Sequence, residues 1–571
     1  MDIGSGNSFD YIIVGGGSAG CVLASRLSSD PAFRVLLVEA GPDFGPGGEP
    51  EELVDPRVRS FMLHQYFWPG LFTSDGPRPK IIMQAKVIGG GSMINGMHAQ
   101  RGVAEDYDEW RQYGVEGWGW KDVLPYFMRL ENDTDFRSAM HGDAGPIEIR
   151  RVPEMQWSRL SLALRESLER RGLARLRDLN SEGGDGTGPV PININKDQRI
   201  SAASAYLKTP VRQRANLKIL ANTSVTRVLL SGRRATGIEL ADGTIVAGGS
   251  IIISAGAIHS PFILLRSGIG PGKHLQERGV TVLAERAGVG QNLRTHPILT
   301  IMTNLRRQGR QLDSAVRPPV PMGVRYSSNL PGCQPTDMML DLWERNPGPL
   351  RRDPMNRQLA LIMVLLNKSY SQGEVRLAAA GGSQQVEVLG SLRDARDLDR
   401  MVQGFLMIRD MVNQEPMKSL VYRSFIPKLA LGSPPSFLMR KLLRDTAEAR
   451  LISRAGALAA DYLPGMRNWI TNMAGLDVRD VPTDPDKLAE LVHTATSFGG
   501  HPGGTCRMGS AQDSHSVVDS GCRVISMENL HVVDASIFPT LMRAGTNLPV
   551  IMAAEKAADA IINDRRRTGT G

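Results

Sequence analysis

The sequence predicts an α/β protein organised around one strand–turn–helix–strand unit near its N-terminus. Residues 10–14 form a β-branched apolar run of strand length that stops at a Gly-x-Gly-x-x-Gly turn. Residues 18–27 then have the character of a helix, and the apolar strand 35–38 ends in Glu39. A strand, a glycine-rich turn, a helix and a terminal acidic residue together are typical of a Rossmann-like dinucleotide-binding unit.

Each position of this unit has its own physical role toward a dinucleotide. Gly15 allows the tight turn, Gly17 lets the backbone approach a pyrophosphate, and Gly20 lets the helix and strand pack closely. The helix that begins at Ser18 offers free N–H groups to phosphate, and Glu39 can accept a hydrogen bond from the adenosine ribose. The pattern predicts dinucleotide binding but does not say which dinucleotide is bound.

Length and composition predict a globular protein of at least two domains. The chain has 571 residues, 41% of them apolar and 22% charged, with a net charge of +8. The arginines at 565–567 have no interleaved aromatic residues, so we interpret them as a solvated tail and expect no nucleic-acid partner. The four cysteines are scattered, which suits a reducing compartment and predicts neither a disulfide framework nor a bound metal.

Nothing in the sequence predicts export or membrane insertion. Residues 1–8 lack the basic start and apolar core of a secretory signal. No apolar run is long enough to span a bilayer. We therefore expect a soluble, cytoplasmic protein without a transmembrane segment.

A second glycine-rich stretch lies at residues 85–98, with the sequence AKVIGGGSMINGMH. It cannot be helical throughout, but it permits a main chain pressed against a flat ligand, and its apolar flanks favour burial. The stretch resembles the first signature of the glucose–methanol–choline (GMC) family of flavin oxidoreductases, where such a segment lies beside the isoalloxazine ring. Within that family, the chain looks most like bacterial hydroxymethylfurfural and aryl-alcohol oxidases.

The resemblance continues through landmarks in the same order along the chain. The aromatic residues of 106–127 are expected to be core, and residues 199–207 are similar to the family's return into the cofactor domain. Residues 254–270 match the second signature, with a short helix expected over 262–266 after Pro261. At the C-terminal landmark, the strand 530–533 ends directly before Asp534. Thr546 or Asn547 can cap the next helix.

The resemblance implies that the cofactor is FAD, held without a covalent bond. Ile94 occupies the position where some family members attach flavin through a histidine, and a branched alkyl group cannot form that bond. The residues that the resemblance implies for FAD binding are Gly15, Gly17, Ser18, Gly20, Glu39, Ala40, Val87, Gly90, Ser92, Asn95, Met97, Val225, Ala255, Asp534, Ala535, Asn547 and Pro549.

His501 is the candidate catalytic residue. Its glycine-rich surroundings, residues 498–509, resemble the family's His-Pro-x-Gly-Thr motif, whose histidine is the active-site base. A hydride leaves an alcohol carbon only with difficulty until the hydroxyl proton has gone, and a neutral imidazole can accept that proton near physiological pH. We interpret His296 as a structural residue of an exposed loop and Cys506 as a small buried hydrophobe.

The chain departs from the family pattern at Gly545, where members carry a histidine or asparagine that helps to hold the substrate oxygen. Either a substrate-domain side chain substitutes, or the reaction runs on His501 alone, or the chain no longer oxidises alcohols. The first two are preferred because the other landmarks are intact. Gly499, Gly500 and Gly545 lack side chains, which predicts a roomy substrate pocket and hence a bulky aryl or allylic primary alcohol.

The resemblance implies two domains. A discontinuous FAD-binding domain comprises residues 1–140, 200–308 and 488–571, and a substrate-binding domain with an antiparallel sheet flanked by helices comprises 141–199 and 309–487. The stretch 434–473 is longer than the family usually has and mixes apolar and basic residues at helical spacing. An ordinary surface helix is the favoured interpretation, with a lid, an oligomer contact and a membrane-surface helix as alternatives.

The favoured function is FAD-dependent oxidation of a primary alcohol to the aldehyde, by deprotonation at His501 and hydride transfer to flavin N5. The expected partners are the alcohol and oxygen, a quinone or another electron acceptor. The alternative is a non-redox or light-driven flavin enzyme on the same fold, a lyase or a decarboxylase. An inactive flavin-binding protein and a nicotinamide dehydrogenase are less favoured, because the ligand loops are intact and the later landmarks are flavin-like.

Overall fold

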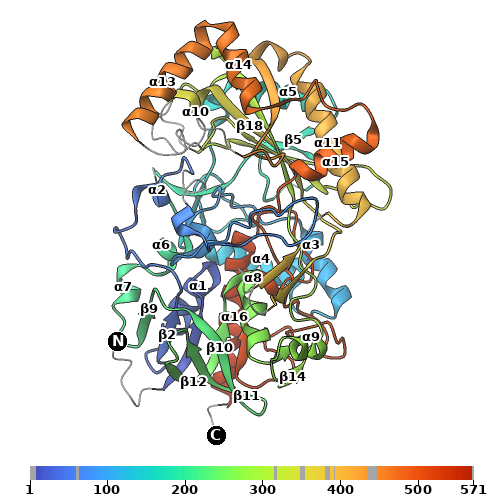
Figure 1. Ribbon diagram of the computed structural model, residues 1–571. Helices are drawn as coiled ribbons and strands as arrows, with labels where there is room; N and C mark the ends of the chain where they lie inside the picture. Colours follow the sequence, from blue (N-terminus) through green and yellow to red (C-terminus); the bar gives the residue numbers. More distant parts are fainter. Residues whose placement is uncertain are drawn as a thin grey trace.

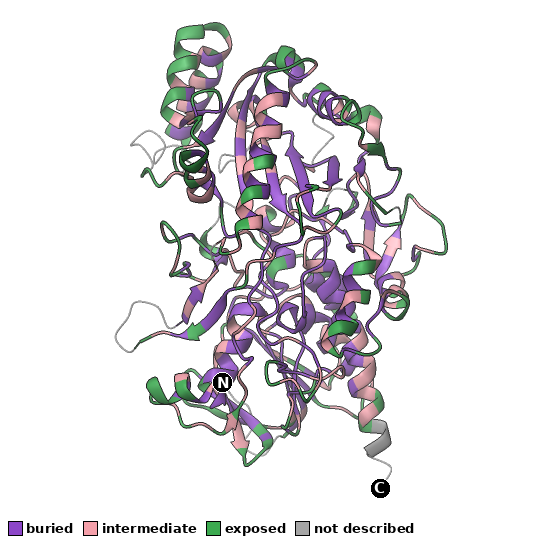
Figure 2. Cartoon of the chain, turned by 90° about the vertical axis from the view of Figure 1, so that its right-hand side faces the viewer, coloured by how far each residue is buried: buried purple, intermediate pink, exposed green. Residues whose placement is uncertain are grey.

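The computed structural model describes residues 8–58, 64–181, 183–196, 198–313, 318–347, 354–379, 386–390, 392–434 and 446–568. Figure 1 shows an elongated molecule with one sheet near the two chain termini and another toward the opposite end, below α13 and α14. Buried residues run continuously through both sheets and the region between them (Figure 2). Each of the two sheets has its own buried apolar cluster.

The sheet near the termini has a parallel core with the order β9-β2-β1-β12-β23. All four residues of β2 are buried, as expected for a parallel strand covered on both faces. An antiparallel hairpin joins the first part of β12. The strands are β1 (Phe9–Val14), β2 (Val35–Val38), β9 (Leu217–Leu220), β10 (Val225–Ser231), β11 (Arg234–Leu240), β12 (Ile245–Ile253) and β23 (Leu530–Val532).

The register of this sheet aligns the carboxyl ends of four strands. Val14 pairs with Val38 on one side and with Ile253 on the other, and Ile253 pairs with Val532. Ligands of open α/β sheets bind beyond the carboxyl ends of the strands, so this edge is the expected cofactor site. The residues that directly follow the four ends are Gly15, Glu39, Ser254 and Val533.

Helices pack against this sheet and against one another. The predicted first helix is confirmed as α1, and it packs against α16 near the C-terminus. The aromatic residues of 106–127 are core as predicted, since Tyr107, Trp110, Trp118 and Phe127 are fully buried. The principal helices of this part are α1 (Ser18–Leu27), α3 (Ala104–Asp108), α4 (Trp120–Leu130), α6 (Ala202–Tyr206), α8 (Gly256–Arg266), α9 (Gly272–Glu277) and α16 (Asn547–Thr568).

The second sheet has the order β22-β21-β15-β18-β17-β16-β6-β5, and its neighbours are antiparallel except β5 and β6. The predicted antiparallel sheet flanked by helices is therefore confirmed. Its strands are β5 (Ala174–Arg175), β6 (Gly186–Pro189), β15 (Ile298–Leu305), β16 (Met322–Tyr326), β17 (Met338–Trp343), β18 (Leu359–Leu366), β21 (Val421–Pro427) and β22 (Gly475–Asp477).

One face of the second sheet is covered by helices. Met401 and Phe405 of α11 share a buried apolar cluster with Leu340 of β17 and Ile362 of β18. Helix α11 begins at Ala395, where Asp394 caps the backbone N–H of Arg396. The helices of this part are α5 (Arg159–Glu169), α10 (Pro354–Gln358), α11 (Ala395–Val412), α13 (Ala447–Tyr462), α14 (Pro464–Ala474) and α15 (Pro485–Ala495).

Smaller elements connect the two sheets. The strand order β3-β4-β7-β8 joins residues on both sides of the boundary predicted at 140. These elements are β3 (Glu131–Asp133), β4 (Ile147–Arg150), β7 (Ile192–Asn195), β8 (Gln198–Arg199), β13 (Ile269–Gly270), β14 (Ala284–Glu285), β19 (Glu374–Leu377), β20 (Val386–Leu389), α2 (Glu51–Val54) and α7 (Thr209–Arg212).

The helix predicted over 262–266 is longer than expected. It is α8, which begins at Gly256 and contains Pro261 in its interior. A proline there leaves the carbonyl of the fourth residue before it, Ala257, without its helical N–H partner. The hydroxyl of Thr505 donates to that carbonyl at 2.6 Å and compensates for the loss. A distant side chain thus stabilises a helix that the local sequence predicts to be shorter.

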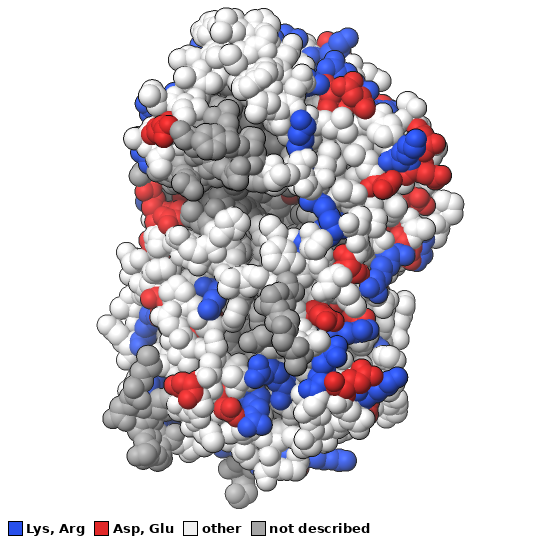
Figure 3. Space-filling model, viewed as in Figure 1, with Lys and Arg blue, Asp and Glu red and all other residues white. Residues whose placement is uncertain are grey.

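Residues 447–474 form two helices on the outside of the substrate sheet. The helical prediction is confirmed for α13, whereas residues 435–445 lie outside the described part of the chain. Exposed apolar side chains gather here, and this end shows a largely uncharged face in Figure 3. None of the described helices combines the length and hydrophobicity that a membrane crossing requires. The exposed apolar residues are Leu451, Leu458, Tyr462, Leu463, Met466, Trp469 and Met473.

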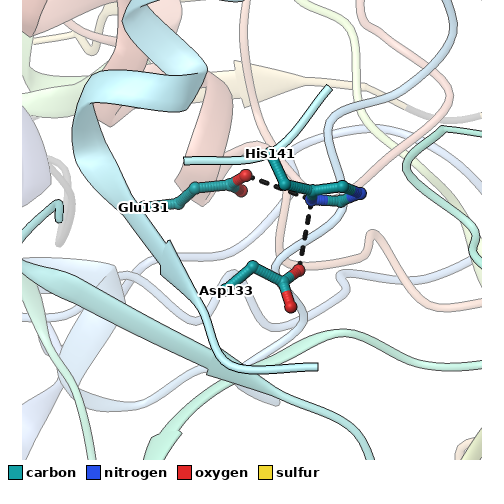
Figure 4. Close-up of side chains that lie close together, drawn as sticks. All are labelled: Glu131, Asp133 and His141. Atoms are coloured by element: carbon teal, nitrogen blue, oxygen red, sulfur yellow. Dashed lines mark hydrogen bonds and ion pairs between the residues drawn. The ribbon is translucent and has the colours of Figure 1, made fainter. Parts of the chain in front are cut away.

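A buried ionic network lies between α4 and the sheet formed by β3, β4, β7 and β8 (Figure 4). Nδ1 of His141 lies 3.1 Å from Oε1 of Glu131 and 3.2 Å from Oδ2 of Asp133. Its Nε2 lies 3.0 Å from Oδ2 of Asp178. Burial alone would lower the pKa of His141, but hydrogen bonds to these three carboxylates raise it to about 10. The imidazole is therefore protonated at neutral pH.

Two arginines complete this network. Arg151 lies 2.9 Å from Asp133 and 2.8 Å from Asp178, and Arg101 pairs with Glu131. Glu131, Asp133 and His141 have a spacing that could hold a metal ion, the one such group in the described part of the chain. The two guanidiniums and the protonated imidazole already balance the three carboxylates, so the arrangement suits an ion-pair network better than a cation site.

The network predicts a pH-dependent stability. The pKa of His141 is about 10 in the folded protein and about 6.5 when unfolded, so its contribution is complete below pH ~6.5 and is lost as the pH rises toward 10. We expect His141→Gln to lower the free energy of unfolding by about 3 kcal/mol at pH 6. The difference should shrink steadily between pH 7 and 10 in urea titrations. A constant difference over that range would show that the imidazole is not protonated.

Candidate active site

The candidate base sits where two distant segments run antiparallel. Arg294 and Gly503 exchange backbone hydrogen bonds of 3.0 and 2.9 Å. Ile298 and Ser497 exchange bonds of 3.3 and 2.8 Å. Residues 295–297 lie between these bridges on one side and residues 498–502 on the other, so the longer segment must bulge. The bulge carries His501.

The bulge places two histidines in contact. Nδ1 of His501 lies 3.0 Å from Nδ1 of His296, with the ring planes at 75°. The expectation that His296 lies in an exposed loop is wrong, because the residue is 1% exposed and has a ring partner. Burial lowers the pKa of His501 to about 4 and the pKa of His296 well below its usual value. Both rings are therefore neutral at physiological pH.

The contact allows a tautomer in which Nε2 of His501 can act as a base. A hydrogen bond between two neutral imidazoles needs one N–H and one lone pair, so one ring carries its proton on Nδ1. With that proton on His501, its Nε2 keeps a free lone pair. Nε2 faces Gly545, because a β-carbon built there would lie 3.4 Å from this nitrogen and 3.6 Å from Cε1. The basic nitrogen therefore faces the position where the chain has lost a side chain.

Of the three glycines predicted to enlarge the pocket, two face open space. A β-carbon at Gly500 would meet no atom within 4 Å, and one at Gly545 would meet only the His501 ring. Gly499 differs, since its β-carbon would lie 2.1 Å from the His296 carbonyl oxygen, and its φ is +83°. This glycine lets the bulge lie on residues 295–296 and adds no room to the pocket.

Further bonds hold the histidine loop against the cofactor sheet. The backbone N–H groups of Gly504 and Cys506 donate to the carbonyls of Ala535 and Ser536 at 3.0 and 2.8 Å. The Thr295 hydroxyl donates to the Phe498 carbonyl at 2.9 Å. Cys506 is fully buried, as predicted. The loop that carries the base is thus anchored just beyond the end of β23.

The glycines of the first turn have different surroundings. A β-carbon at Gly15 would lie 2.5 Å from the Ser254 carbonyl oxygen, and one at Gly20 only 1.9 Å from that of Gly15. Protein packing therefore excludes side chains at both positions. A β-carbon at Gly17 would have its nearest neighbours at 4.0 Å, the Gly90 Cα and the Ser254 oxygen. The space beside Gly17 is open to a ligand, and no side chain caps the α1 N-terminus there.

The polar residues predicted for this edge are brought together. Ser18 at the start of α1 donates to Oδ1 of Asn547 at the start of α16 at 2.8 Å. The Glu39 carboxylate accepts from the backbone N–H groups of Gly16 and Gly41 at 2.8 and 2.7 Å and retains further lone pairs for a ribose. Asp534 accepts from the Gly256 N–H at 2.9 Å.

The other residues predicted to bind FAD lie at the same edge or in the adjoining loop. Val87, Gly90, Ser92 and Met97 are buried, and Gly90 has a φ of +52° that brings it against Gly17. Ala255 caps α8, Ala535 follows Asp534, and Pro549 lies in the first turn of α16. Ala40 follows Glu39, and Val225 begins β10 two residues after Thr223, whose N–H donates to the Glu39 carbonyl at 2.8 Å.

Arg199 is a site residue that the sequence interpretation did not single out. Its guanidinium donates to Oδ1 of Asn95 at 2.6 Å and to the carbonyls of Ser92 and Leu53 at 3.2 and 3.0 Å. Burial lowers its pKa to about 9. The Ser92 hydroxyl accepts from the Ala202 N–H at 2.9 Å. These contacts join segments about 100 positions apart, so no local pattern reveals them.

Comparisons with known proteins identify the family to which the chain belongs. Two family profiles described as GMC oxidoreductase match residues 9–298 and 369–554. The chain belongs to the GMC oxidoreductase family. The 5-(hydroxymethyl)furfural oxidase of Methylovorus sp. strain MP688 is 35% identical, covering 97% of this chain and 98% of that protein. An oxygen-dependent choline dehydrogenase of Brucella ovis is 32% identical, with coverage of 97% and 95%.

Solved structures agree with this assignment. Pyridoxine 4-oxidase from Mesorbium loti superposes with a TM-score of 0.78 at 27% identity, covering 97% of this chain and 99% of that one. A formate oxidase shares the fold with a TM-score of 0.79 at 20% identity, covering 98% and 99%. The GMC oxidoreductase described here is therefore a flavin-dependent oxidoreductase that acts on CH–OH groups, and its cofactor is FAD.

The cofactor edge fits FAD. The open space beside Gly17 and the uncapped start of α1 suit a pyrophosphate, and Glu39 suits the adenosine ribose. The segment 89–95 lies against the first turn, because the Gly89 N–H donates to the Gly16 carbonyl at 2.8 Å. Asn547 begins α16 on the other side. The residues present can hold the dinucleotide along the aligned strand ends.

The low pKa of His501 predicts an acid-shifted activity profile. The base must be neutral to accept a proton, and it stays neutral down to about pH 4, where an ordinary imidazole would be half protonated at about pH 6.5. We expect the rate constant of anaerobic flavin reduction to be flat from about pH 8 to 6 and to fall only below about pH 5. A fall centred at pH 6.5 would contradict this burial of the base.

The histidine contact predicts a positioning role for His296. His296→Leu removes the acceptor for the Nδ1 proton of His501 and should slow flavin reduction about 10- to 100-fold without loss of bound flavin. His296→Asn keeps a polar atom near the position of Nδ1 and should retain most of the rate. If both variants are equally slow, the contact serves packing and does not orient the base.

Proposed function

We propose that this GMC oxidoreductase oxidises a primary alcohol bearing a bulky aryl or allylic group to the aldehyde. The proposal rests on the orientation of His501. Its Nδ1 contacts His296, while Nε2 faces the open space beside Gly545. A half-buried neutral imidazole with one nitrogen hydrogen-bonded and the other facing open space is arranged to accept a proton.

The chain's residues supply the proton-transfer part of the reaction. The substrate hydroxyl gives its proton to Nε2 of His501, and the Nδ1 proton, donated to His296, holds the ring during the transfer. The alkoxide oxygen then forms the carbonyl as the hydride leaves the carbon with its electron pair. FAD, when bound, supplies the acceptor for this hydride at N5. One proton and one hydride leave the alcohol, which gives the aldehyde.

Several features support a bulky substrate. Gly500 and Gly545 leave space around the base. Thr300, Met302 and Met363, on the sheet face opposite the helices, are only half-buried and give that face an apolar character. The name of one relative, 5-(hydroxymethyl)furfural oxidase, describes a hydroxymethyl group on an aromatic ring. A planar aromatic alcohol fits this combination of open space and apolar wall.

Other features of the site remain part of this proposal. Ile94 cannot form a covalent bond to flavin, which supports non-covalent FAD. The division into an FAD-binding domain (1–140, 200–308 and 488–571) and a substrate-binding domain (141–199 and 309–487) supports the placement of the base between them. The relatives named oxidase and oxygen-dependent dehydrogenase support oxygen as electron acceptor, with a quinone as the alternative.

Anaerobic mixing of the purified yellow protein with a panel of alcohols tests the proposal. Benzyl-type alcohols should bleach the flavin at least about tenfold faster than methanol or choline, because only they fill the pocket. Admission of air should then restore the colour if oxygen is the acceptor. His501→Ala should keep the flavin but slow its reduction about 100-fold or more.

The matched control is His515→Ala, which removes an exposed histidine and should leave the rate unchanged. Near-normal reduction in His501→Ala would remove this residue from the mechanism. Failure of every alcohol to bleach the flavin would favour the lyase or decarboxylase alternative. Equal rates with methanol and benzyl alcohol would contradict the bulky substrate.

A further inference from the structure

The inner face of the substrate sheet carries a buried carboxylate. Asp341 of β17 lies opposite Gly323 on one side and Met363 on the other, and Met363 lies opposite Thr300 of β15. Residues opposite one another in an antiparallel sheet share a face. Leu340 and Leu342 point to the other face, into the helix-covered core. Asp341 therefore faces the same side as the half-buried Thr300 and Met363.

A neighbouring segment presents two more polar side chains to this face. Residues 98–100 run antiparallel to the segment around Ile192, because the Ala99 N–H donates to the Pro191 carbonyl at 2.8 Å and the Asn193 N–H to the Met97 carbonyl at 2.9 Å. Side chains alternate along an extended chain, so His98 and Gln100 point the same way. Nδ1 of His98 lies 3.7 Å from Oδ2 of Asp341, longer than a hydrogen bond.

Gln100 reaches the same part of the sheet. Its Nε2 lies 3.8 Å from the β-carbon position of Gly323, the residue opposite Asp341. The closest neighbours of that position are Val190 and Leu179, at 3.0 and 3.1 Å. His98, Gln100 and Asp341 thus converge from two chain segments. We refer to these three residues as the polar subsite.

Each member of the polar subsite has a buried atom without a hydrogen-bond partner among the described residues. These atoms are Nε2 of His98, Oε1 of Gln100 and Oδ1 of Asp341. Gln100 and Asp341 are each 5% exposed, and burial raises the pKa of the Asp341 carboxyl. Native proteins rarely leave several such atoms together, because each costs free energy unless a partner is supplied. The set is therefore arranged for a polar ligand.

The polar subsite lies close to the catalytic base. Burial lowers the pKa of His501 most, and His98 is close enough to lower it further by its electrostatic effect. The β-carbon position of Gly96 lies 3.7 Å from Nε2 of His98 and 3.6 Å from Cζ2 of Trp343. Gly96 belongs to the glycine-rich loop at the cofactor edge. A substrate that reaches His501 from the sheet side would pass these groups.

We propose that Asp341, His98 and Gln100 bind a second hydrogen-bond donor on the alcohol substrate, so that preferred substrates are aromatic alcohols with an additional hydroxyl or amino group. The carboxylate and amide oxygens accept, and an anionic substituent is repelled by Asp341. This inference rests on the proposed alcohol oxidation and names its substrate class.

The test compares substrates that differ only at the far end. Meta- and para-substituted benzyl alcohols carrying hydroxymethyl, aminomethyl, ethyl or carboxylate groups are assayed by anaerobic flavin reduction. Hydroxymethyl and ethyl have similar sizes, so their ratio reports the donor alone. In the wild-type enzyme, the hydroxymethyl or aminomethyl compound should exceed the ethyl compound in kcat/KM by at least about tenfold, with the carboxylate compound poorest.

Variants of the polar subsite should change this ratio in defined ways. Asp341→Leu should remove the preference for the donor while the ethyl compound keeps its rate within about twofold. Asp341→Asn keeps an acceptor but loses the charge, so it should retain part of the hydroxymethyl preference and accept the carboxylate compound about tenfold better. Asp486→Asn, which removes an exposed carboxylate at the start of α15, should change none of the ratios.

The outcomes separate this inference from the proposed function. If no alcohol reduces the flavin, the proposed function fails. If all compounds reduce it but the ratios are near one, or persist in Asp341→Leu, only the polar subsite is overturned. If Asp341→Leu does not fold, Asp341→Asn tests the polar subsite instead. A kcat/KM for the carboxylate compound equal to that of the wild-type enzyme would then overturn the assignment.

Discussion

The hydrogen bond between the two Nδ1 atoms of His296 and His501 is the contact on which the proposed chemistry depends. It allows the tautomer in which Nδ1 of His501 carries the proton and Nε2 keeps a lone pair. Without it, a histidine among glycines could rotate and present either nitrogen. The bond exists because two antiparallel segments differ in length between their bridges, which pushes His501 out of the pairing plane.

Holding this contact requires precise packing of backbone on backbone. Gly499 allows the bulge to lie on the His296 carbonyl, and Thr505 ties the end of the loop to the gap that Pro261 leaves in α8. The histidine loop therefore rests on the helix that begins at the cofactor edge. Groups fixed by the surrounding fold stay in place during a reaction, which favours catalysis over a flexible loop.

The loop that carries Gly545 is anchored by buried charges. The backbone N–H of Arg543 donates to Asp106 at 2.7 Å and its guanidinium does so at 2.6 Å. Nζ of Lys368 lies 3.2 Å from Asp106 and donates to the Leu541 carbonyl at 2.8 Å. Lys368 follows β18 of the substrate sheet, whereas Asp106 belongs to α3 beside the cofactor sheet. The network thus sets the distance between the base and the substrate face.

The sequence by itself determined the first strand–turn–helix–strand unit, the buried aromatic cluster, the family and the candidate base, because these depend on local spacing and on motifs. It also predicted the antiparallel sheet through the family resemblance. The tertiary structure alone decided that α8 continues through Pro261, that His296 is buried against a residue 205 positions away, and that Gly499 adds no room. Only the tertiary structure, too, brought Asp341 near His98. These features come from hydrogen bonds and close approaches between distant segments, and such contacts leave no periodic signal in the chain.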